Sequence, residues 1–294
     1  MREAFVRTVM SLMDQDPRTA LVLADISEDR FAPVLARHPD RAVNVGIMEQ
    51  AMVGVAAGFA MEGFHPFAHS LSPFMAERPY EQLKLDFGYQ GLGGTFVGAG
   101  GSYDYGSEGG THHSPADVQA MLAIPGMEVL VPGHPDEVDG LIRATYANGR
   151  PTYLRLSAGV NEEALDVAPG RMEVLRRGSL ATVIAVGPTL TRTLEACEGV
   201  DVTILYATSA RPFDSATLTK TAGDVPLVIT VEPFYEGTLA APVTEALGHL
   251  AVRYVWIGVP RAFIHTYGTP AELDAELGLD TAGIRRRLTA FLPR

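Results

Sequence analysis

The sequence predicts an α/β protein built from two layered α/β domains whose sheets are mostly parallel. The first observation is the regular alternation of short apolar runs with segments of helical spacing along almost the whole chain. The second is the content of the apolar runs, such as residues 20–24 (ALVLA), which is typical of strands buried on both faces. The third is one stretch without periodicity, at residues 157–178, which divides the chain.

The individual elements follow from these patterns. Residues 2–15 place Phe5, Val9, Leu12 and Met13 on one face and are predicted to form an amphipathic helix. Further helices are expected at residues 49–61, 80–89, 114–124, 135–148, 190–196 and 239–250. Strands are expected at residues 20–24, 43–45, 65–71, 94–99, 128–131, 152–156, 180–186, 202–206, 227–231 and 252–257. Ligands of such sheets bind beyond the carboxyl ends of the strands, so we expect functional residues directly after strands.

The aperiodic stretch contains acidic residues, then basic ones, and the pair Pro169-Gly170, so we interpret it as a linker. The first domain then covers residues 1–160 and the second, smaller domain covers residues 176–294. The length of 294 residues suits two domains of roughly 100–200 residues each. We expect the second domain to serve dimerisation and packing, with His265 and Tyr267 at an interface or in the core.

The composition excludes several classes of function. The 23 Lys and Arg against 35 Asp and Glu give a net charge of −12 without a basic run, which argues against nucleic acid or an anionic membrane as partner. The single cysteine, Cys197, excludes an intrachain disulfide and a cysteine-based metal site. The first residues do not resemble a signal peptide, and no apolar run is long enough to cross a membrane. We therefore expect a cytoplasmic protein.

One segment that follows a predicted strand carries a candidate acid. Residues 46–50 (GIMEQ) place Glu49 at the start of a helix, next to Ile47 and Met48. A carboxyl in apolar surroundings is either paired or protonated, because burying an isolated charge is costly. The alternative is a first-turn glutamate that interacts favourably with the helix dipole.

Two further segments offer an aromatic ring and a glycine-rich loop. Phe74 follows the strand at residues 65–71 and either stacks on a flat ligand ring or belongs to the core. The loop at residues 98–115 lacks the spacing of phosphate-binding motifs. His112 in this loop is either an acid/base or hydrogen-bonding group for a substrate or part of a helix-capping segment. For His113 we favour the capping interpretation, because Ser114 and Pro115 form a cap and first-turn pair.

In their order and spacing these segments resemble the C-terminal part of transketolase, in the split form in which two shorter chains share the enzyme. In the first domain the resemblance rests on GIMEQ at residues 46–50, PF at 73–74, YEQLK at 80–84, EGGTH at 108–112, AIPGMEVLVP at 123–132 and RPTYLRL at 150–156. In the second domain it is clearest at residues 204–214 and 263–273. It covers nearly the whole chain and extends more weakly to deoxyxylulose-phosphate synthases and 2-oxoacid dehydrogenase beta subunits.

The resemblance implies that thiamine diphosphate is the cofactor and that the first domain grips its aminopyrimidine ring. Glu49 matches the family's catalytic glutamate, which donates a hydrogen bond to a pyrimidine nitrogen and thereby favours the tautomer that activates the thiazolium. His112 matches a loop histidine that faces substrate oxygens. The resemblance places the remaining groups at the pyrimidine ring (Phe74, Ile47, Met48 and Leu71) and at the substrate hydroxyls (Glu108). The implied reaction transfers a two-carbon ketol unit from a ketose to an aldehyde.

Three departures from the family pattern concern the substrate. Glu108 stands where transketolases typically carry Asp, and Ala158 lies near the position of the family's phosphate-binding arginine. Gly100 and Gly101 stand where relatives that use phosphorylated sugars carry His or Arg. Without these charge-assisted contacts a phosphate is poorly discriminated. We therefore expect a substrate other than an ordinary sugar phosphate, unless another residue or the partner chain supplies the clamp.

The diphosphate half of such enzymes needs a Gly-Asp-Gly motif and an asparagine-rich segment, which hold the metal. The chain has no Gly-Asp-Gly, and its only asparagines are Asn44, Asn148 and Asn161. We therefore expect no metal ligands in this chain and a second subunit that carries the diphosphate-binding domain and holds Mg²⁺ or Ca²⁺. An α2β2 heterotetramer is the expected assembly, because sites of this family lie across subunit contacts.

Two other functions compete with this interpretation. A 2-oxoacid dehydrogenase beta subunit, or a condensing enzyme of the deoxyxylulose-phosphate-synthase type, shares the architecture, and residues 111–115 (THHSP) have some similarity to the former. Residues 73–74, 80–82 and 108–112 fit transketolase better. A non-catalytic scaffold subunit is the alternative of another class, but such a subunit has no reason to keep Glu49 beside Phe74.

Overall fold

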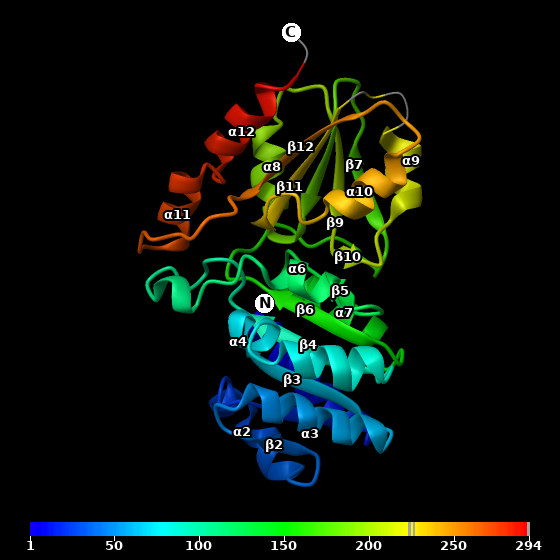
Figure 1. Cartoon of the computed structure of the whole chain (residues 1–294), viewed down its shortest axis with the longest axis vertical. Coiled ribbons are helices and arrows are strands. Elements are labelled where there is room, and N and C mark those ends of the chain that lie inside the picture. Colours follow the sequence, from blue (N-terminus) through cyan, green and yellow to red (C-terminus); the bar gives the residue numbers. More distant parts are fainter. Residues whose placement is uncertain (223–224, 226, 293–294) are drawn as a thin grey trace.

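The computed structural model describes residues 1–222, 225 and 227–292. The strands of the first sheet are β1 (Thr19–Leu23), β2 (Ala42–Asn44), β3 (His65–Leu71), β4 (Gly94–Ala99), β5 (Glu128–Leu130), β6 (Pro151–Leu156) and β10 (Ser209–Arg211). The strands of the second sheet are β7 (Met172–Arg176), β8 (Thr182–Val186), β9 (Thr203–Ala207), β11 (Leu227–Tyr235) and β12 (Arg253–Val259). The two sheets follow each other along the long axis of the molecule (Figure 1).

Helices pack around both sheets. The first half of the chain contributes α1 (Arg2–Gln15), α2 (Glu28–Arg37), α3 (Glu49–Met61), α4 (Ser72–Ala76), α5 (Tyr80–Gln82), the π-helix η1 (Leu83–Tyr89), the 3₁₀ turn η2 (Gly109–Thr111), α6 (Asp117–Leu122) and α7 (Pro135–Thr145). The second half contributes the 3₁₀ turn η3 (Gly187–Thr189), α8 (Leu190–Ala196), α9 (Ser215–Ala222), α10 (Ala240–Leu247), α11 (Pro270–Leu277) and α12 (Thr281–Thr289). Among the described residues no helix has the length and apolar content needed to cross a membrane.

The strand order confirms the predicted fold class. The first sheet has the order β10-β5-β6-β4-β3-β1-β2 and the second β12-β11-β8-β9-β7. Every pair is parallel except β10 with β5 and β7 with β9. The molecule therefore consists of two α/β domains, each with a mostly parallel sheet. The exact limits of the two domains stay a prediction.

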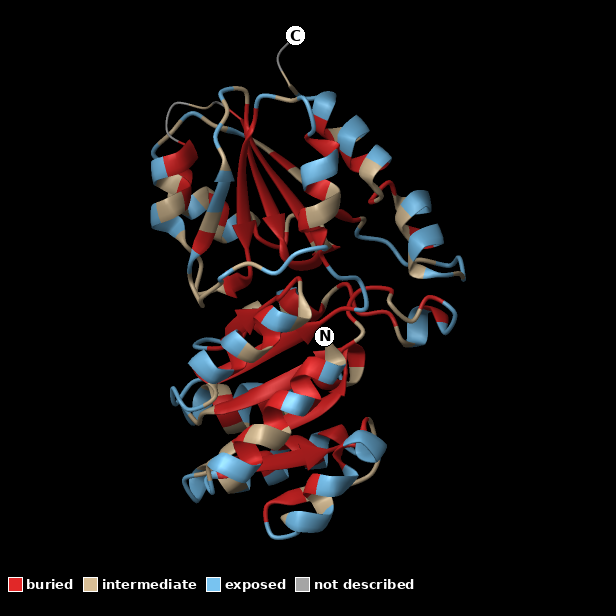
Figure 2. Ribbon diagram, turned by 180° about the vertical axis from the view of Figure 1, so that it is seen from behind, coloured by how far each residue is buried: buried red, intermediate tan, exposed pale blue. Residues whose placement is uncertain are grey.

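The first sheet is buried on both faces, as its apolar runs predict. Leu21 and Leu23 of β1 pack with Phe5 of α1 on one face. Val22 of the same strand packs with Met52 of α3 on the other. Successive side chains of a strand point to opposite faces, so a continuous apolar run is needed to bury both. Figure 2 shows the result as buried strands enclosed by helices that keep one exposed side.

The linker prediction for residues 157–178 is wrong in its second half, which contains β7. This strand lies at the edge of the second sheet and leaves Val174 and Leu175 partly exposed, so it lacks the apolar run that marks the inner strands. β10 is likewise absent from the predicted strands, because its three residues form a strand only through antiparallel pairing with β5. The predicted helix at residues 114–124 begins only at Asp117.

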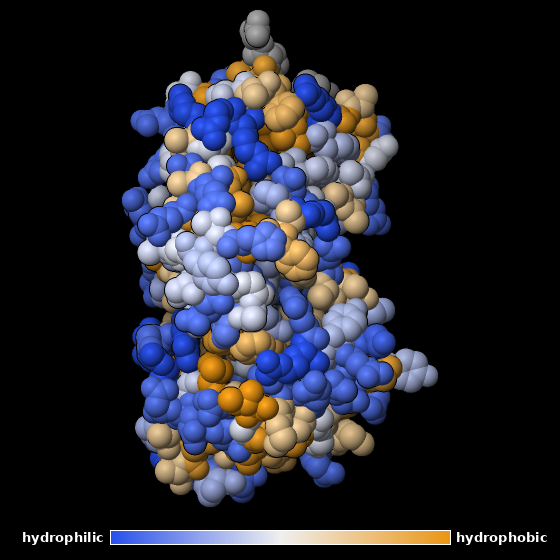
Figure 3. Space-filling view, turned by 60° about the vertical axis from the view of Figure 1, so that its left-hand side comes forward, coloured by the Kyte–Doolittle hydropathy of each residue, from blue (hydrophilic) through white to orange (hydrophobic). Residues whose placement is uncertain are grey.

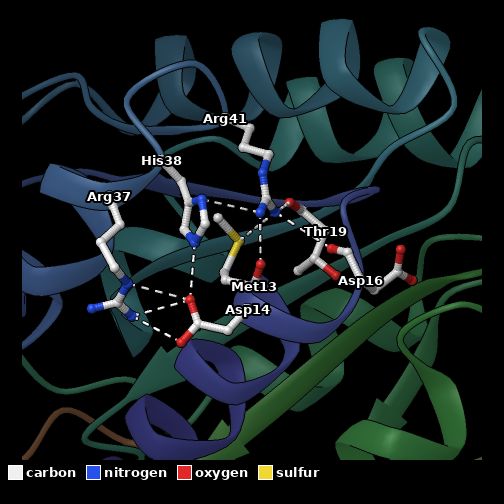
Figure 4. A network of polar contacts seen from close by, with 7 residues as sticks. All are labelled: Met13, Asp14, Asp16, Thr19, Arg37, His38 and Arg41. Carbon is white, nitrogen blue, oxygen red and sulfur yellow. Dashed lines mark hydrogen bonds and ion pairs between the residues drawn. The ribbon is translucent and has the colours of Figure 1, made fainter.

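A buried arginine joins the connections around β1 (Figure 4). Arg41 precedes β2, and its guanidinium donates to the carbonyl oxygens of Met13 at 2.6 Å and Thr19 at 2.7 Å. It also lies 3.2 Å from His38 Nδ1, and His38 Nε2 lies 2.9 Å from Asp14. The carbonyl of Met13 near the end of α1 and the carbonyl of Thr19 at the start of β1 thus share one donor, which fixes how α1 turns into the sheet.

A histidine in β3 makes the first domain sensitive to acid. His69 is fully buried, with Nδ1 2.9 Å from the carbonyl oxygen of Val97 and Nε2 2.9 Å from the hydroxyl of Ser27. A carbonyl only accepts, so Nδ1 carries the proton and Nε2 accepts from the hydroxyl. Burial, with a smaller contribution from Arg2, lowers the pKa of His69 from 6.5 to about 3.

This pKa predicts a loss of stability as the pH falls from 6.5 toward 3, because the unfolded chain takes up a proton that the folded chain refuses. His69 should contribute a slope of about 1.4 kcal/mol per pH unit to the free energy of unfolding in that range. Urea unfolding at pH 7, 6 and 5 measures this slope. His69→Gln should remove the contribution of about 1.4 kcal/mol per pH unit, which corresponds to the uptake of one proton on unfolding. The exposed His249 provides the control; equal slopes for His69→Gln and His249→Gln would contradict the assignment.

Candidate active site

The predicted site residues follow three strands of the first sheet at their carboxyl ends. β2 leads through residues 45–48 into α3, of which Glu49 is the first residue. β3 passes directly into α4, which contains Phe74. β4 leads into the loop at residues 100–116, which contains His112. Because parallel strands end at the same edge of a sheet, the three connections meet there.

Glu49 is a buried carboxylate with two polar partners. Its side chain is 1% exposed. Ser70 Oγ donates to Oε1 at 3.1 Å, and Arg78 Nη1 donates to Oε2 at 2.6 Å. Of the two states expected from the sequence, paired or protonated, the structure has the paired one, since an arginine 29 positions along the chain contacts the carboxyl. Such a long-range partner leaves no local signal in the sequence.

Arg78 also joins Glu49 to the predicted aromatic platform. Its guanidinium carbon lies 4.1 Å from the centroid of the Phe74 ring. On from there, the Phe74 ring meets the His112 ring edge to face, with centroids 5.3 Å apart. The structure thus brings together three residues predicted from the sequence and one that was missed. We call Glu49, Arg78, Phe74 and His112 the site row.

Two predicted apolar neighbours of the pyrimidine ring are exposed in this chain. Ile47 is 69% exposed and Met48 is 55% exposed, whereas Leu71 is buried. The described chain therefore does not close an apolar pocket around Glu49 by itself. Exposed apolar side chains continue along α3 with Val55. Figure 3 shows orange side chains gathered in the lower half of the molecule, which holds the first sheet. Exposed apolar patches mark interaction sites.

The glycine-rich loop is closed by its own backbone and held by the second domain. Ser114 N–H donates to the carbonyl oxygen of Ser102 at 2.7 Å, which brings the two ends together. Gly109 has a φ of +69°, and a Cβ there would lie 2.5 Å from the Tyr267 ring. Glycine is therefore required at this position for both reasons. Tyr267 was considered from the sequence as an interface or core residue, and its ring does pack on this loop.

Within the loop the two predicted substrate residues differ. His112 is half-buried, with Nδ1 2.9 Å from Thr111 Oγ1, so its ring is oriented from two sides. Glu108 is exposed, and its carboxylate has no hydrogen-bond partner among the described residues. It lies free to meet a ligand or a partner chain.

A fully buried ion pair supports the loop from below. Arg155 of β6 donates from Nε to Asp117 Oδ2 at 2.9 Å, from Nη1 to Ser157 Oγ at 2.8 Å and from Nη2 to Ser102 Oγ at 2.6 Å. Nη2 also donates to the carbonyl oxygen of Pro233 in β11, which belongs to the second sheet. Arg155 is thus wholly engaged in structure and unavailable to a phosphate.

Ala158 lies near the position of the family's phosphate-binding arginine, and here its backbone is held by a carboxylate. Ala158 N–H donates to Asp104 Oδ2 at 2.7 Å. Burial raises the pKa of Asp104 to about 6. At Gly101 a Cβ would collide with the Arg155 guanidinium, so a larger residue cannot replace it. The local structure therefore agrees with the departures seen in the sequence.

The residues present fit only one half of thiamine diphosphate. A buried carboxyl next to an aromatic face, Glu49 with Phe74, suits the aminopyrimidine ring. No group of three or more His, Cys, Asp or Glu side chains in the described ranges is close enough together to hold a metal ion.

Two family models match the chain. The matching family models are the pyrimidine-binding domain of transketolase, over residues 1–161, and the C-terminal domain of transketolase, over residues 170–284. The chain belongs to the transketolase family. The predicted resemblance to one chain of a split transketolase is confirmed by the relatives.

Three relatives illustrate this. A protein of Rhodococcoides fascians described as an uncharacterized 33.6 kDa protein in the fasciation locus is 38% identical over 292 residues, 98% of this chain and 94% of its own length. One of the subunits of the apulose-4-phosphate transketolase of Actinobacillus succinogenes is 32% identical over 242 residues, 79% and 76% of the two chains. A solved structure described as an inactive β4 tetramer of a split-gene transketolase superposes with a TM-score of 0.85 at 28% identity, covering 98% of both chains.

The Glu49–Arg78 pair predicts a coupling that can be measured in the chain alone. Arg78→Ala leaves a buried carboxylate without its cation, so the free energy of unfolding at pH 7 should fall by about 1–3 kcal/mol. In a Glu49→Gln background the same change should cost much less, which gives a coupling of at least about 1 kcal/mol in a double-mutant cycle.

The exposed pair of Arg143 with Asp139, 2.9 Å apart on α7, is the matched control. Exposed pairs four residues apart on a helix contribute about 0.3–0.5 kcal/mol. A coupling for Glu49 with Arg78 that is no larger than this would show that the charge is balanced in another way.

Proposed function

We propose that this chain is the pyrimidine-binding subunit of a two-chain transketolase that transfers a two-carbon ketol unit from a ketose to an aldehyde. The observation that carries the proposal is the site row, in which a buried carboxyl adjoins an aromatic face and a histidine. Thiamine diphosphate supplies, when bound, the carbon centre that carries the two-carbon unit. The residues of this chain bind it, orient it and hold a proton.

Each member of the row has a proposed role. Glu49 holds a proton at a ring nitrogen of the aminopyrimidine, and burial keeps water away from that hydrogen bond. Phe74 offers its face to the ring, and Leu71 lies at the end of the preceding strand. His112 donates a hydrogen bond to a substrate oxygen whose charge increases as the carbon–carbon bond breaks. Glu108 accepts hydrogen bonds from substrate hydroxyls.

Arg78 must move before the ring can bind. Its guanidinium contacts both the carboxylate of Glu49 and the face of Phe74, the two groups proposed to hold the ring. The side chain is partly exposed and long enough to turn outward. When it leaves, the carboxyl of Glu49 and the face of Phe74 are both free to contact the ring.

The partner chain is proposed to cover Ile47 and Met48 and to supply the diphosphate and metal ligands. Their exposure beside the site row supports a contact there. The solved relative, which contains β chains without a partner, is described as inactive. An α2β2 assembly with Mg²⁺ or Ca²⁺ held by the partner chain follows the same proposal.

Reconstitution with the chain that carries Gly-Asp-Gly, sought in the neighbouring reading frame, tests the proposal. The mixture with thiamine diphosphate and Mg²⁺ should transfer a two-carbon unit from a ketose to an aldehyde. Glu49→Gln should lower kcat by at least about 100-fold, because it removes an acid at the cofactor. Glu62→Gln, at the exposed end of the same helix, should leave the rate unchanged.

Other outcomes would identify the competing functions. Release of carbon dioxide from pyruvate by the mixture, without ketol transfer, would favour a 2-oxoacid dehydrogenase beta subunit. Full activity of the Glu49→Gln complex, with normal assembly, would favour a non-catalytic scaffold subunit.

A further inference from the structure

Tyr105 of the glycine-rich loop continues the site row beyond His112. The centroid of its ring lies 6.2 Å from that of the His112 ring, and the two ring planes meet at 62°. The centroid of the Phe74 ring lies 5.3 Å from that of the same His112 ring. His112 therefore contacts two aromatic rings, of which Phe74 connects it to Glu49 through Arg78 and Tyr105 connects it to the beginning of the loop.

The Tyr105 ring occupies the space beside Gly100. Gly100 has a φ of +77°, and a Cβ at this position would collide with the Tyr105 ring. A backbone with this φ favours glycine by itself, and the ring excludes a side chain in addition. Tyr105 thus fills the volume that a side chain of residue 100 would need.

This volume belongs to the far end of the substrate site. The resemblance to transketolase places His or Arg at Gly100 and Gly101, and an arginine near Ala158, in relatives that bind the phosphate of a sugar. In this chain the space at Gly101 is taken by the guanidinium of Arg155, which is engaged with protein partners. The Tyr105 ring therefore stands where such relatives have a cationic clamp.

The backbone donor at this end is occupied by a carboxylate. Ala158 N–H donates to Asp104 Oδ2 at 2.7 Å, and Asp104 N–H donates to the carbonyl oxygen of Gly101 at 3.1 Å. Burial raises the pKa of Asp104 to about 6, which still leaves its carboxyl mostly ionised at pH 7. A phosphate at this end would meet a negative charge, and it would find the N–H group of Ala158 already bonded.

The loop leaves little room behind Asp104. The cavity between the loop and the second domain has a volume of about 60 Å³ and is lined by Asp104 on one side and Glu232 on the other, among other residues. This volume holds a few water molecules and is far below the roughly 300–1,000 Å³ of ligand pockets. A substrate that extends from His112 along the loop therefore ends at Tyr105 and does not continue between the domains.

The Tyr105 side chain suits an uncharged chain end. The residue is half-buried, and the described residues offer no hydrogen-bond partner for its hydroxyl. An aromatic face packs against the C–H groups of a sugar chain, while a phenol hydroxyl both donates and accepts hydrogen bonds. A terminal hydroxyl group of a substrate can use both properties, whereas a phosphate finds no cation here.

We propose that Tyr105 is a specificity-determining residue that binds the uncharged, hydroxylated far end of the substrate in place of a phosphate clamp, and that Asp104 repels phosphate esters there. The inference rests on the proposed transketolase function and deepens it by naming the substrate class. The relative named for apulose 4-phosphate is a different chain at 32% identity, so preference for a phosphate ester is an outcome of the test.

The reconstituted enzyme should be assayed with D-xylulose and with D-xylulose 5-phosphate as donors and the same aldehyde as acceptor. The wild type should have a kcat/KM at least about tenfold higher for the uncharged donor. Tyr105→Phe should raise the KM for D-xylulose about threefold to tenfold and change kcat less than about twofold, because the hydroxyl acts away from the reacting carbon.

Two further variants test the closed end of the site. In the double variant Gly100→His with Tyr105→Ala, removal of the ring makes room for a histidine, which tolerates a positive φ better than most residues. The ratio of the two kcat/KM values should then shift about tenfold or more toward the phosphate ester. Asp104→Asn should shift the same ratio about threefold or more, because the amide oxygen still accepts from Ala158 N–H but carries no charge.

Asp40→Asn is the matched control, because it makes the same charge change at an exposed residue before β2, at the opposite edge of the sheet from the site. An equal ratio for Asp104→Asn and Asp40→Asn would overturn the role of Asp104. A wild type that prefers the phosphate ester, or a Tyr105→Phe variant with unchanged KM, would overturn the proposal as a whole.

A binding measurement separates this proposal from the transfer activity. In the mixture of both chains without thiamine diphosphate no transfer takes place, and the ring signal of ¹³C-labelled Tyr105, assigned with Tyr105→Phe, reports on binding alone. D-Xylulose should shift this signal saturably, whereas D-xylulose 5-phosphate at the same concentration should not. If the shift occurs but the complete enzyme transfers no ketol unit, the proposed function fails and the assignment of Tyr105 stands. If no shift occurs, the assignment of Tyr105 fails, whether or not transfer is observed.

Discussion

The buried carboxylate of Glu49 is the constraint on which the site depends. A charge that is 1% exposed must be balanced nearby, and the chain balances it with Arg78 and Ser70. This requirement draws the guanidinium across the face of Phe74 and so aligns the carboxyl with the ring. Replacing a buried ion pair by apolar residues is often neutral or stabilising, so the burial of this carboxylate is better explained by its chemistry than by stability.

A second buried charge holds the frame around the site. Arg155 connects β6 to Asp117 at the start of α6, to Ser102 at the base of the glycine-rich loop and to the second sheet at Pro233. The loop between Ser102 and Ser114 is therefore rigidly supported, while its outer residue Glu108 stays exposed. The second domain thus helps to position the loop that carries His112.

The local patterns of the sequence predicted most of the fold but only part of the site. Uniform apolar runs identified the inner strands, whereas β7 lies at an edge and lacks such a run. Glu49, Phe74 and His112 were predicted from segments that resemble transketolase in their order and spacing, and the structure brings the three residues together. Arg78 escaped notice because its pairing with Glu49 spans 29 positions. Ile47 and Met48 were placed in a pocket because apolar residues suggest burial, although a surface that awaits a partner has the same composition.

The central claim is that half of a thiamine diphosphate site is built on this chain and half on another. Calorimetric titration of thiamine diphosphate with Mg²⁺ tests it most directly, first into the purified chain and then into its mixture with the partner. The account predicts no saturable binding to the chain alone and saturable binding to the mixture, weakened when Glu49 is replaced by Gln. Saturable binding to the single chain, accompanied by turnover, would contradict it.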